Sequence, residues 1–392
     1  MYIDENIEEI RREFPVLESK TYLNSAAHGP TLRRTYDAVE EWWRKRLNEE
    51  DTGTPDTLRE AAKLLHCDTS EICWTNRVSQ GLNMVASMMP FKRGDNVVVT
   101  ELGYQSNVFV WLPFRSKGVE IRRIKHRDGI IETSDFEKAI DDKTKVVCLS
   151  RVEWTSGIKY DMRAISETAH KHGAYVVDDG YQALGATDVD LYRDNVDFFT
   201  AGCEKWLCFP AMIGVFYIRK DLNPMFEPMY RNYHSVEEAF KEGAPWEKPD
   251  HDNIQSYDKP LYKDARKFYR GCVSEEHIHG FNACLKYFNQ LDPRNIQKKT
   301  TSLSQYLIDQ LKGYDVKVNT PIEANRRAAL VTYNTGNYER NQKIFDALKR
   351  EGIVVAHRYA SGVGGIRVSC HFFNTKDEID RLMEVQKQVL AN

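Results

Sequence analysis

The most constraining feature of this sequence is a regular alternation of short apolar runs with helical segments between residues 70 and 220. Seven runs are rich in β-branched or aromatic residues: ICWT (72–75), NVVVT (96–100), VEIRRIK (119–125), KVVCLS (145–150), AYVVDD (174–179), DFFTAG (197–202) and GVFYIRK (214–220). Between two of them, DMRAISETAHKHG places Met162, Ile165 and Ala169 on one helical face. Apolar strands separated by helices are typical of a parallel sheet that is buried on both faces. We therefore predict an α/β fold with a mostly parallel seven-stranded sheet sandwiched by helices.

The rest of the chain divides into smaller parts around this region. Helical patterns and short strands resume after residue 275, and Thr375 with Glu378 forms a capping box at the start of the last helix. We expect an N-terminal helix over residues 1–20 that packs with the small domain, a large domain over 21–275, and a small α+β domain over 276–392. Residues 221–265 are polar, aperiodic and broken by Pro and Gly, which indicates a long surface excursion.

A helix predicted within the first 50 residues carries one apolar stripe. Its members are Leu32, Tyr36, Val39, Trp43 and Leu47, at steps of three or four residues. We expect this stripe to face the core, with Trp43 buried and Trp42 on its flank.

Charge and hydropathy exclude several classes of protein. The formal net charge of −3 at pH 7 argues against a surface that binds nucleic acid, and a hydrophobic fraction of 41% lies in the globular range. No apolar run approaches the roughly 20 residues that cross a bilayer. The first residues, MYIDENIEEIRREF, are charged and unlike a secretory signal. We expect a cytoplasmic protein that binds neither nucleic acid nor membranes.

The cysteines and histidines do not form a recognisable metal site. Eight cysteines occur without CxxC pairs, and several lie inside apolar runs, so we expect buried free thiols. Cys67 with Cys73, and His277 with His279, do not complete a set of four ligands. The sequence therefore predicts no metal.

Two stretches place charged residues where predicted strands end, which is where open α/β sheets bind ligands. The run AYVVDD ends in Asp178 and Asp179, and Gln182 follows the turn. By itself, Asp-Gly after a strand is more often an ordinary turn. Lys205 lies between two apolar runs, where desolvation would favour the neutral amine that can form a Schiff base. A lysine that reaches solvent remains an equal alternative.

A third stretch, TNRVSQGLN (75–83), passes from a strand into a helix. The first backbone N–H groups of a helix, together with the hydroxyl of Ser79, suit a phosphate group. An ordinary serine at a helix N-terminus explains the pattern equally well.

Together and in this order, Ser79, Asp179 and Lys205 resemble the fold-type I pyridoxal-phosphate enzymes. More narrowly, the chain resembles the class V aminotransferase family, which includes cysteine desulfurases and isopenicillin N epimerase. The resemblance spans nearly the whole chain. The matching stretches are YLNSAAHGP (22–30), TNRVSQGLN (75–83), GYQSNVFVW (103–111), VVDDGYQALGA (176–186), EKWLCFPAMIGVFYI (204–218) and GIRVSCHFFNTKDEIDRL (365–382).

The resemblance implies a cofactor, pyridoxal 5'-phosphate, bound by the large domain. Lys205 would hold it as a Schiff base and then act as a general base, while Asp179 would pair with its pyridinium nitrogen. Val78 and Ser79 would donate to its phosphate. Gln182 would donate toward its ring 3-oxygen, and Tyr104 or the adjacent Gln105 would cover its face. Arg367 would bind the carboxylate of an amino-acid substrate. A homodimer is also implied.

The sequence departs from the family at four places. Glu204 stands where a histidine is common, and we hypothesise that Arg77 offsets its charge or binds the phosphate. Gly271-Cys272 replaces a Gly-Thr that contacts a neighbouring subunit's phosphate, and Trp154 replaces an asparagine near the cofactor. Finally, VVAHRYASGVGGIR (354–367) has no cysteine, although cysteine desulfurases need a loop thiolate there. A desulfurase that works through a loop persulfide is therefore not expected.

Three functions stay open on this evidence. An aminotransferase comes first, because Lys205 alone can move the proton. An epimerase or racemase would need a second acid, for which Tyr104, His28 and His357 are candidates, and a β-elimination lyase stands beside it. The third possibility is a non-catalytic protein that uses the fold for binding.

Overall fold

The computed structural model describes residues 2–237, 260–271 and 273–390. Its centre is a seven-stranded sheet with the strand order β2-β8-β7-β6-β5-β3-β4. These strands are β2 (Ile72–Thr75), β3 (Asn96–Thr100), β4 (Glu120–Ile124), β5 (Thr144–Ser150), β6 (Tyr175–Asp179), β7 (Phe198–Gly202) and β8 (Gly214–Ile218). Pairing is parallel from β4 through β7, and β8 runs antiparallel to both of its neighbours. The predicted α/β fold and mostly parallel sheet are confirmed.

Alternation along the strands explains why both faces of this sheet are covered. In β3, Val98 belongs to one apolar cluster, whereas Val97 and Val99 belong to another on the opposite face. The first face packs against α3 (Thr57–Leu65), α6 (Thr133–Ala139), α7 (Met162–Lys171) and α9 (Glu275–Leu291), and the second packs against α4 (Val78–Met88). Two short helices, α5 (Ser106–Phe109) and α8 (Leu191–Asp194), follow strand ends.

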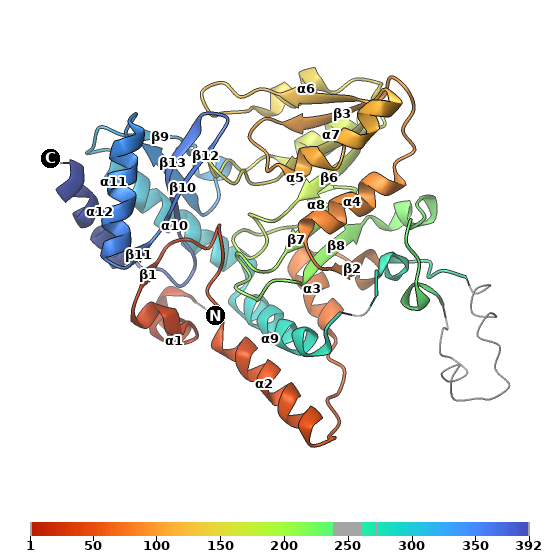
Figure 1. The fold of residues 1–392 in the computed structure, drawn as a ribbon, viewed down its shortest axis with the longest axis horizontal. Helices are drawn as coiled ribbons and strands as arrows, with labels where there is room; N and C mark the ends of the chain where they lie inside the picture. The colour runs from red at the N-terminus through yellow and green to blue at the C-terminus, as the bar shows by residue number, and fades with distance from the viewer. Residues whose placement is uncertain (1, 238–259, 272, 391–392) are drawn as a thin grey trace.

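The C-terminal part lies beside the central sheet (Figure 1). Its antiparallel sheet has the order β12-β13-β10-β9. The strands are β9 (Lys317–Val318), β10 (Leu330–Asn334), β12 (Ala356–Ala360) and β13 (Val363–Ser369), and the helices are α10 (Pro293–Leu311), α11 (Tyr338–Arg350) and α12 (Lys376–Leu390). A further pair joins the ends of the chain, because β1 (Thr21–Tyr22) runs parallel to β11 (Ile353–Val354).

The N-terminal segment also packs on the C-terminal part. After α1 (Ile7–Arg12), the ring of Phe14 lies 4.4 Å from that of Phe373, and Arg11 forms an ion pair with Glu378. The exact domain bounds stay a prediction. Of the predicted surface excursion, residues 238–259 lie outside the described residues.

The prediction that the apolar stripe of the helix after residue 32 faces the core, with Trp43 buried, is wrong. In α2 (Arg33–Leu47), Trp42 is buried, while the side chains of Tyr36, Trp43 and Leu47 are 59%, 50% and 81% exposed. The reason is the packing of α2 on α9, where Gly280 brings the helices so close that a Cβ there would lie 2.7 Å from Val39. The face that turns inward is therefore the one with Val39 and Trp42.

The seven described cysteines are free, and all except Cys67 are buried, as predicted. Within the described ranges, no helix is both long enough and apolar enough to cross a membrane.

Candidate active site

The two adjacent aspartates at the end of β6 point to opposite sides of the sheet and have different partners. Asp178 accepts hydrogen bonds from Arg151, one of them at 2.9 Å. Asp179 accepts from the backbone N–H of Tyr181 at 3.0 Å and from the hydroxyl of Ser150 at 3.2 Å. Asp178 is thus committed to a buried ion pair, and Asp179 is the aspartate that Lys205 faces.

Lys205 follows β7 and reaches toward Asp179. Its Nζ lies 3.6 Å from the ring centroid of Tyr181 and 5.8 Å from that of Tyr104. Burial lowers the pKa of Lys205 to about 8, and the nearby positive charge of Arg367 acts in the same direction. Burial raises the pKa of Asp179, against the charge of Lys205. These shifts favour a desolvated lysine over one that simply reaches solvent.

Arg367 supplies a buried positive charge near Lys205. It lies in β13, is 2% exposed, and donates from Nη1 to the backbone oxygen of Trp154 at 2.8 Å. Burial lowers the pKa of Arg367 to about 9. Across the described part of the chain it forms no ion pair with a carboxylate. A buried guanidinium is costly without an anion, so its position suits a carboxylate from outside the protein.

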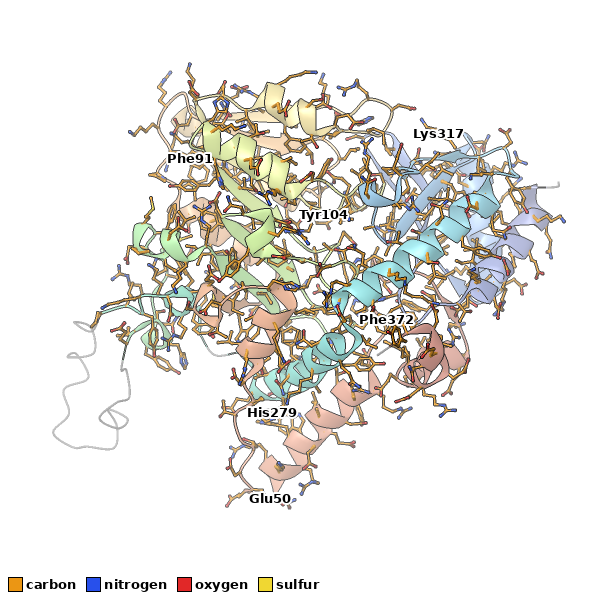
Figure 2. The ribbon with its side chains drawn as sticks, turned by 180° about the vertical axis from the view of Figure 1, so that it is seen from behind. Glu50, Phe91, Tyr104, His279, Lys317 and Phe372 are labelled. Atoms are coloured by element: carbon orange, nitrogen blue, oxygen red, sulfur yellow. The ribbon has the colours of Figure 1, made fainter. Side chains whose placement is uncertain are left out.

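Tyr104 and Trp154 form the aromatic part of the site. Their rings meet edge to face with centroids 5.6 Å apart. Tyr104 lies where the central-sheet part meets the C-terminal part (Figure 2). Because the ring of Tyr104 is 45% exposed and close to Lys205, it can cover one face of a planar ligand.

The predicted phosphate end is the N-terminus of α4, where Val78 is buried and Ser79 is exposed. The helix approaches β7 so closely that a Cβ on Gly81 would lie 2.2 Å from Oγ1 of Thr200. Thr200 pairs in register with Asp179. The first turn of α4 is therefore held near the strand that ends in Asp179. The backbone N–H groups of this turn could donate hydrogen bonds to an anion.

Gln182 is tied into the walls of the site. Its Nε2 donates to the backbone oxygen of Ala26 at 3.0 Å, and its Oε1 accepts from the indole of Trp206 at 2.8 Å. One N–H of the amide is left for the predicted donation to a ring oxygen.

Sequence reasoning missed the partner of Glu204. This side chain is 5% exposed, and its Oε1 accepts a hydrogen bond from the hydroxyl of Tyr181. Arg77 contacts the sulfur of Met212 at 3.7 Å and forms no ion pair with Glu204 in the described part of the chain. That Arg77 offsets the charge of Glu204 or binds the phosphate stays a prediction. The sequence did contain one signal for this contact: Tyr181, a large aromatic residue with a hydroxyl, lies between Asp179 and Gln182.

A second missed residue is Glu153, which is fully buried after β5. Its Oε1 accepts from Thr100 at 2.9 Å and from the hydroxyl of Tyr160 at 3.0 Å. Burial raises the pKa of Glu153 to about 7, and the charge of Asp179 adds to the shift. An acidic residue three positions after the apolar run KVVCLS was the signal in the sequence.

The residues around Lys205 fit the implied cofactor. Several buried polar atoms here have no hydrogen-bond partner among the described residues: Thr75 Oγ1, Thr200 Oγ1, Glu204 Oε2, Trp154 Nε1 and Arg367 Nε. Buried polar groups normally have partners, so a cluster of such atoms indicates a polar ligand that completes the bonding. A metal fits less well, because the described residues contain no group of three or more His, Cys, Asp or Glu side chains placed to hold one.

The segment before Arg367 is a tight hairpin. Ser361 and Gly362 join β12 to β13, and the hydroxyl of Ser361 donates to the backbone oxygen of Glu101 at 3.1 Å. His357 on this hairpin contacts Gln342 and Tyr359, at 3.0 and 2.9 Å. Cys272, which was considered for a contact with a neighbouring subunit, lies outside the described residues.

Comparisons with known proteins bear on the family and the fold. Residues 45–382 match the family Aminotransferase class-V. A probable cysteine desulfurase from Methanothermobacter thermautotrophicus is 25% identical, over 97% of this chain and 98% of that protein. The apo structure of a cysteine desulfurase from Thermococcus onnurineus is similar with a TM-score of 0.84 and 22% identity, covering 98% of each chain. The cystine C-S lyase C-DES, in complex with its product cysteine persulfide, has a TM-score of 0.82 and 19% identity, covering 95% of this chain and 98% of that one.

Proposed function

The chain belongs to the aminotransferase class-V family, whose cofactor is pyridoxal 5'-phosphate, and we propose that it transfers the amino group of an amino acid to a 2-oxo acid. The observation that carries this proposal is the arrangement of Lys205, Asp179 and Arg367. Lys205 has a pKa lowered to about 8 and faces a buried acid, while Arg367 is a buried cation that forms no ion pair within the described ranges.

Each residue has a distinct part in this proposal. Val78 and Ser79 hold the cofactor's phosphate, and Asp179 holds a proton at the ring nitrogen. Gln182 donates to the ring oxygen, and Tyr104 covers the ring. When bound, the cofactor accepts the electron pair left on the α-carbon of the substrate.

Lys205 and Arg367 act on the substrate. Arg367 orients the substrate carboxylate by a bidentate, charge-assisted contact. The backbone oxygen of Trp154 holds Arg367 in place. The neutral amine of Lys205 would take the proton from the α-carbon of the substrate and hold it at Nζ until it is returned. One base is sufficient, so transamination requires no residue beyond those the site contains.

A β-elimination lyase is the second candidate, supported by the similarity to the cystine C-S lyase. The same base could start this reaction. Desulfuration through a loop persulfide finds no support, although similar proteins carry that name, because the hairpin before Arg367 has no thiol. Epimerisation needs an acid on the second face. Of the three candidates for that acid, His357 is already engaged by Gln342 and Tyr359, which leaves Tyr104 and His28.

The test is a product screen with the cofactor-loaded protein. Amino acids are supplied in deuterium oxide with and without pyruvate or glyoxylate, and the products are followed by NMR and mass spectrometry. Turnover that depends on the oxo acid supports transamination. Pyruvate and a thiol or persulfide formed without an added oxo acid would establish elimination, and loss of stereochemistry alone would establish epimerisation.

Two variants locate the chemistry. Lys205→Ala should lose the absorbance of the lysine-bound cofactor together with all turnover, whereas Lys171→Ala, an exposed lysine on α7, should retain both. A Lys205→Ala protein with full activity would refute the role of Lys205. A wild-type protein that takes up no added cofactor would refute the assignment and favour a non-catalytic role.

We further propose a homodimer in the cytoplasm, on the strength of the family resemblance. The exposed stripe of α2, formed by Tyr36, Trp43 and Leu47, is the candidate contact with the second copy. Light scattering should give twice the chain mass, and Trp43→Glu with Leu47→Glu should lower it. A monomeric wild-type protein would contradict the proposal.

A further inference from the structure

Two arginines of the C-terminal sheet lie on the same face of that sheet. In the antiparallel pair of β12 and β13, Arg367 lies opposite Ala356 and Arg358 lies opposite Gly365. Opposed residues share a face, and residues two apart along a strand point the same way. The side chains of Arg358 and Arg367 are therefore diagonal neighbours, about 7–8 Å apart, which is within reach of long side chains.

Contacts on the two faces of this sheet show which face borders the candidate active site. The residues that alternate with Arg367 in β13 belong to the apolar cluster that includes residues of α11 and α12. Arg367 itself donates to the backbone oxygen of Trp154 at 2.8 Å, and Thr332, its partner on β10, donates to the backbone oxygen of Thr155. The face with Arg367 and Arg358 is therefore turned toward the central-sheet part.

Neither arginine has an acidic partner. Arg358 is exposed and donates from Nη1 to the backbone oxygen of His357 at 2.9 Å. Among the described residues, no carboxylate lies within 4 Å of the guanidinium group of Arg358 or of Arg367. Burial and the positive charge of Arg358 both lower the pKa of Arg367, so the two cations repel each other. This face thus carries two positive charges that the described protein does not neutralise.

The hairpin formed by β12 and β13 is held in place by contacts that do not use these charges. The hydroxyl of Ser361 donates to the backbone oxygen of Glu101 at 3.1 Å, and Nε2 of His126 contacts the backbone oxygen of Ser361 at 3.0 Å. The carboxylate of Glu101 accepts from the backbone N–H of His126 at 3.3 Å. Because Gly365 has no side chain, the residue opposite Arg358 leaves its stem uncovered.

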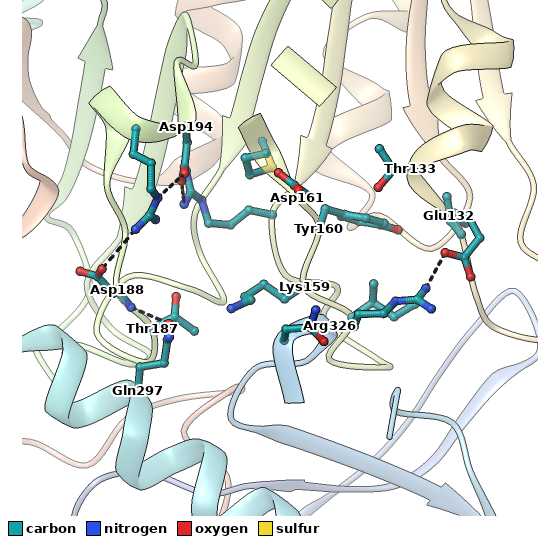
Figure 3. Close-up of a pocket in the computed structure, with 16 residues that line it drawn as sticks. Glu132, Thr133, Lys159, Tyr160, Asp161, Thr187, Asp188, Asp194, Gln297 and Arg326 are labelled. Atoms are coloured by element: carbon teal, nitrogen blue, oxygen red, sulfur yellow. Dashed lines mark hydrogen bonds and ion pairs between the residues drawn. The ribbon is translucent and has the colours of Figure 1, made fainter. Parts of the chain in front are cut away.

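Other arginines where the two parts of the molecule meet do have acidic partners. A cavity of about 540 Å³ at this junction is lined by Arg193, which contacts Asp194 at 2.9 Å, and by Arg326, which contacts Glu132 at 2.7 Å (Figure 3). The charges of these arginines are balanced within the protein, whereas those on β12 and β13 are left for a ligand.

We propose that the substrate is an acidic amino acid, with a second carboxylate in its side chain, together with the corresponding 2-oxo acid. This inference rests on the proposed function, in which Arg367 binds the α-carboxylate. Arg358 is then the specificity-determining residue, because it binds the side-chain carboxylate through a charge-assisted contact. A neutral side chain would leave the charge of Arg358 without a partner, so the site selects against it.

Calorimetric titration of the cofactor-loaded protein tests this proposal, with succinate, glutarate and butyrate as separate probes at constant ionic strength. These probes have no amino group and bind without reacting. Wild-type protein should bind at least one dicarboxylate about tenfold or more tightly than butyrate, as expected for one more charged partner. Arg358→Gln should lose this preference and keep its affinity for butyrate. Arg350→Gln, which changes an exposed arginine on α11, should behave like wild type.

Two further variants make the result decisive. Arg358→Lys keeps the charge and should retain a preference for the dicarboxylate, and an unchanged cofactor spectrum in Arg358→Gln checks the fold. Arg367→Gln should weaken the binding of all three probes. No saturable binding of either dicarboxylate to wild type, equal affinity for dicarboxylate and butyrate, or a preference that Arg358→Gln retains would overturn the proposal.

The outcome is separable from that of the proposed function, because the titration requires no turnover. A protein that prefers the dicarboxylates but shows no turnover dependent on an oxo acid would contradict transamination alone. Turnover of alanine with an oxo acid, without turnover of aspartate or glutamate, would contradict the acidic substrate alone.

Discussion

Replacement of Arg151 by methionine should destabilise the protein strongly, because it leaves a buried charge without a partner. The guanidinium lies between Asp178 and Asp194, and all three side chains are almost fully buried. Asp194 keeps a second cation in Arg193. Asp178 has no other ion-pair partner within the described residues, so the variant buries one uncompensated carboxylate.

Removal of one member of a buried ion pair costs about 3–5 kcal/mol. For a domain of this size, each kcal/mol corresponds to about 2–4 °C in melting temperature, so the expected drop is about 6–20 °C. The matched control is Arg163→Met. Arg163 forms a 3.0 Å pair with Glu167 in which both side chains are more than half exposed, and its loss should cost less than about 1 kcal/mol.

The deficit of Arg151→Met should also depend on pH. Burial raises the pKa of Asp178 to about 6 in the wild type, even though Arg151 lowers it. Without Arg151 the pKa of Asp178 rises further, so the folded variant binds a proton that the unfolded chain does not bind until about pH 4. Proton uptake by the folded state stabilises it as pH falls. The difference from wild type should therefore be largest near pH 8 and smaller near pH 5.5.

Urea denaturation followed by circular dichroism at pH 8 and pH 5.5 measures both effects. Asp178→Asn in the Arg151→Met background should recover part of the loss at pH 8. Stability of Arg151→Met within 1 kcal/mol of wild type at pH 8, or a deficit that grows as the pH falls, would refute the reasoning.

Three other predictions concern the active site. Gly81→Ala should weaken cofactor binding in an absorbance titration, because its Cβ would lie 2.2 Å from Thr200 and overpacking of this kind costs about 1–3 kcal/mol. Gly313→Ala, where the nearest atom would lie 3.9 Å from the new Cβ, controls for the loss of a glycine. Arg367→Gln should raise KM for the amino acid by about 10–100-fold while the cofactor spectrum is retained, and an unchanged KM would contradict a role in binding the carboxylate. The rate at which cofactor-free protein takes up the cofactor should rise with pH through about 8, where Lys205 loses its proton; a stopped-flow rate that is flat between pH 6 and 9 would exclude Lys205 as the group that titrates.

The central fold could be predicted from the sequence because its signal is local. Each strand of the sheet is a short apolar run, and residues such as Val97, Val98 and Val99 must be apolar because both faces are covered. The inward face of α2 could not be predicted in this way. It is decided by the close approach of Gly280 on α9, more than 200 residues away along the chain, and this approach turns Trp42 inward and leaves Trp43 exposed.

The same distinction applies to the candidate site: the positions of some residues could be predicted from the sequence, but their partners from other elements could not. Asp179 ends β6 and Lys205 comes three residues after β7, so their place at the edge of the sheet could be inferred from the sequence. The distinction between Asp178 and Asp179 could not, because it depends on Arg151 from the end of the neighbouring strand. The same holds for Glu204, whose partner Tyr181 lies in the loop after a different strand.

Glu204 and Tyr181 have a chemical consequence for the amine beside them. The hydroxyl of Tyr181 donates to Glu204, so the electron-rich face of its ring, rather than a second donor, is turned toward Lys205 at 3.6 Å. An aromatic face attracts the ammonium form of the lysine, while burial and Arg367 favour the neutral amine. Through Tyr181, Glu204 thus fixes the ring that borders the amine of Lys205. Both forms of Lys205 are consequently accessible near neutral pH, which is the condition for a group that must take a proton and return it.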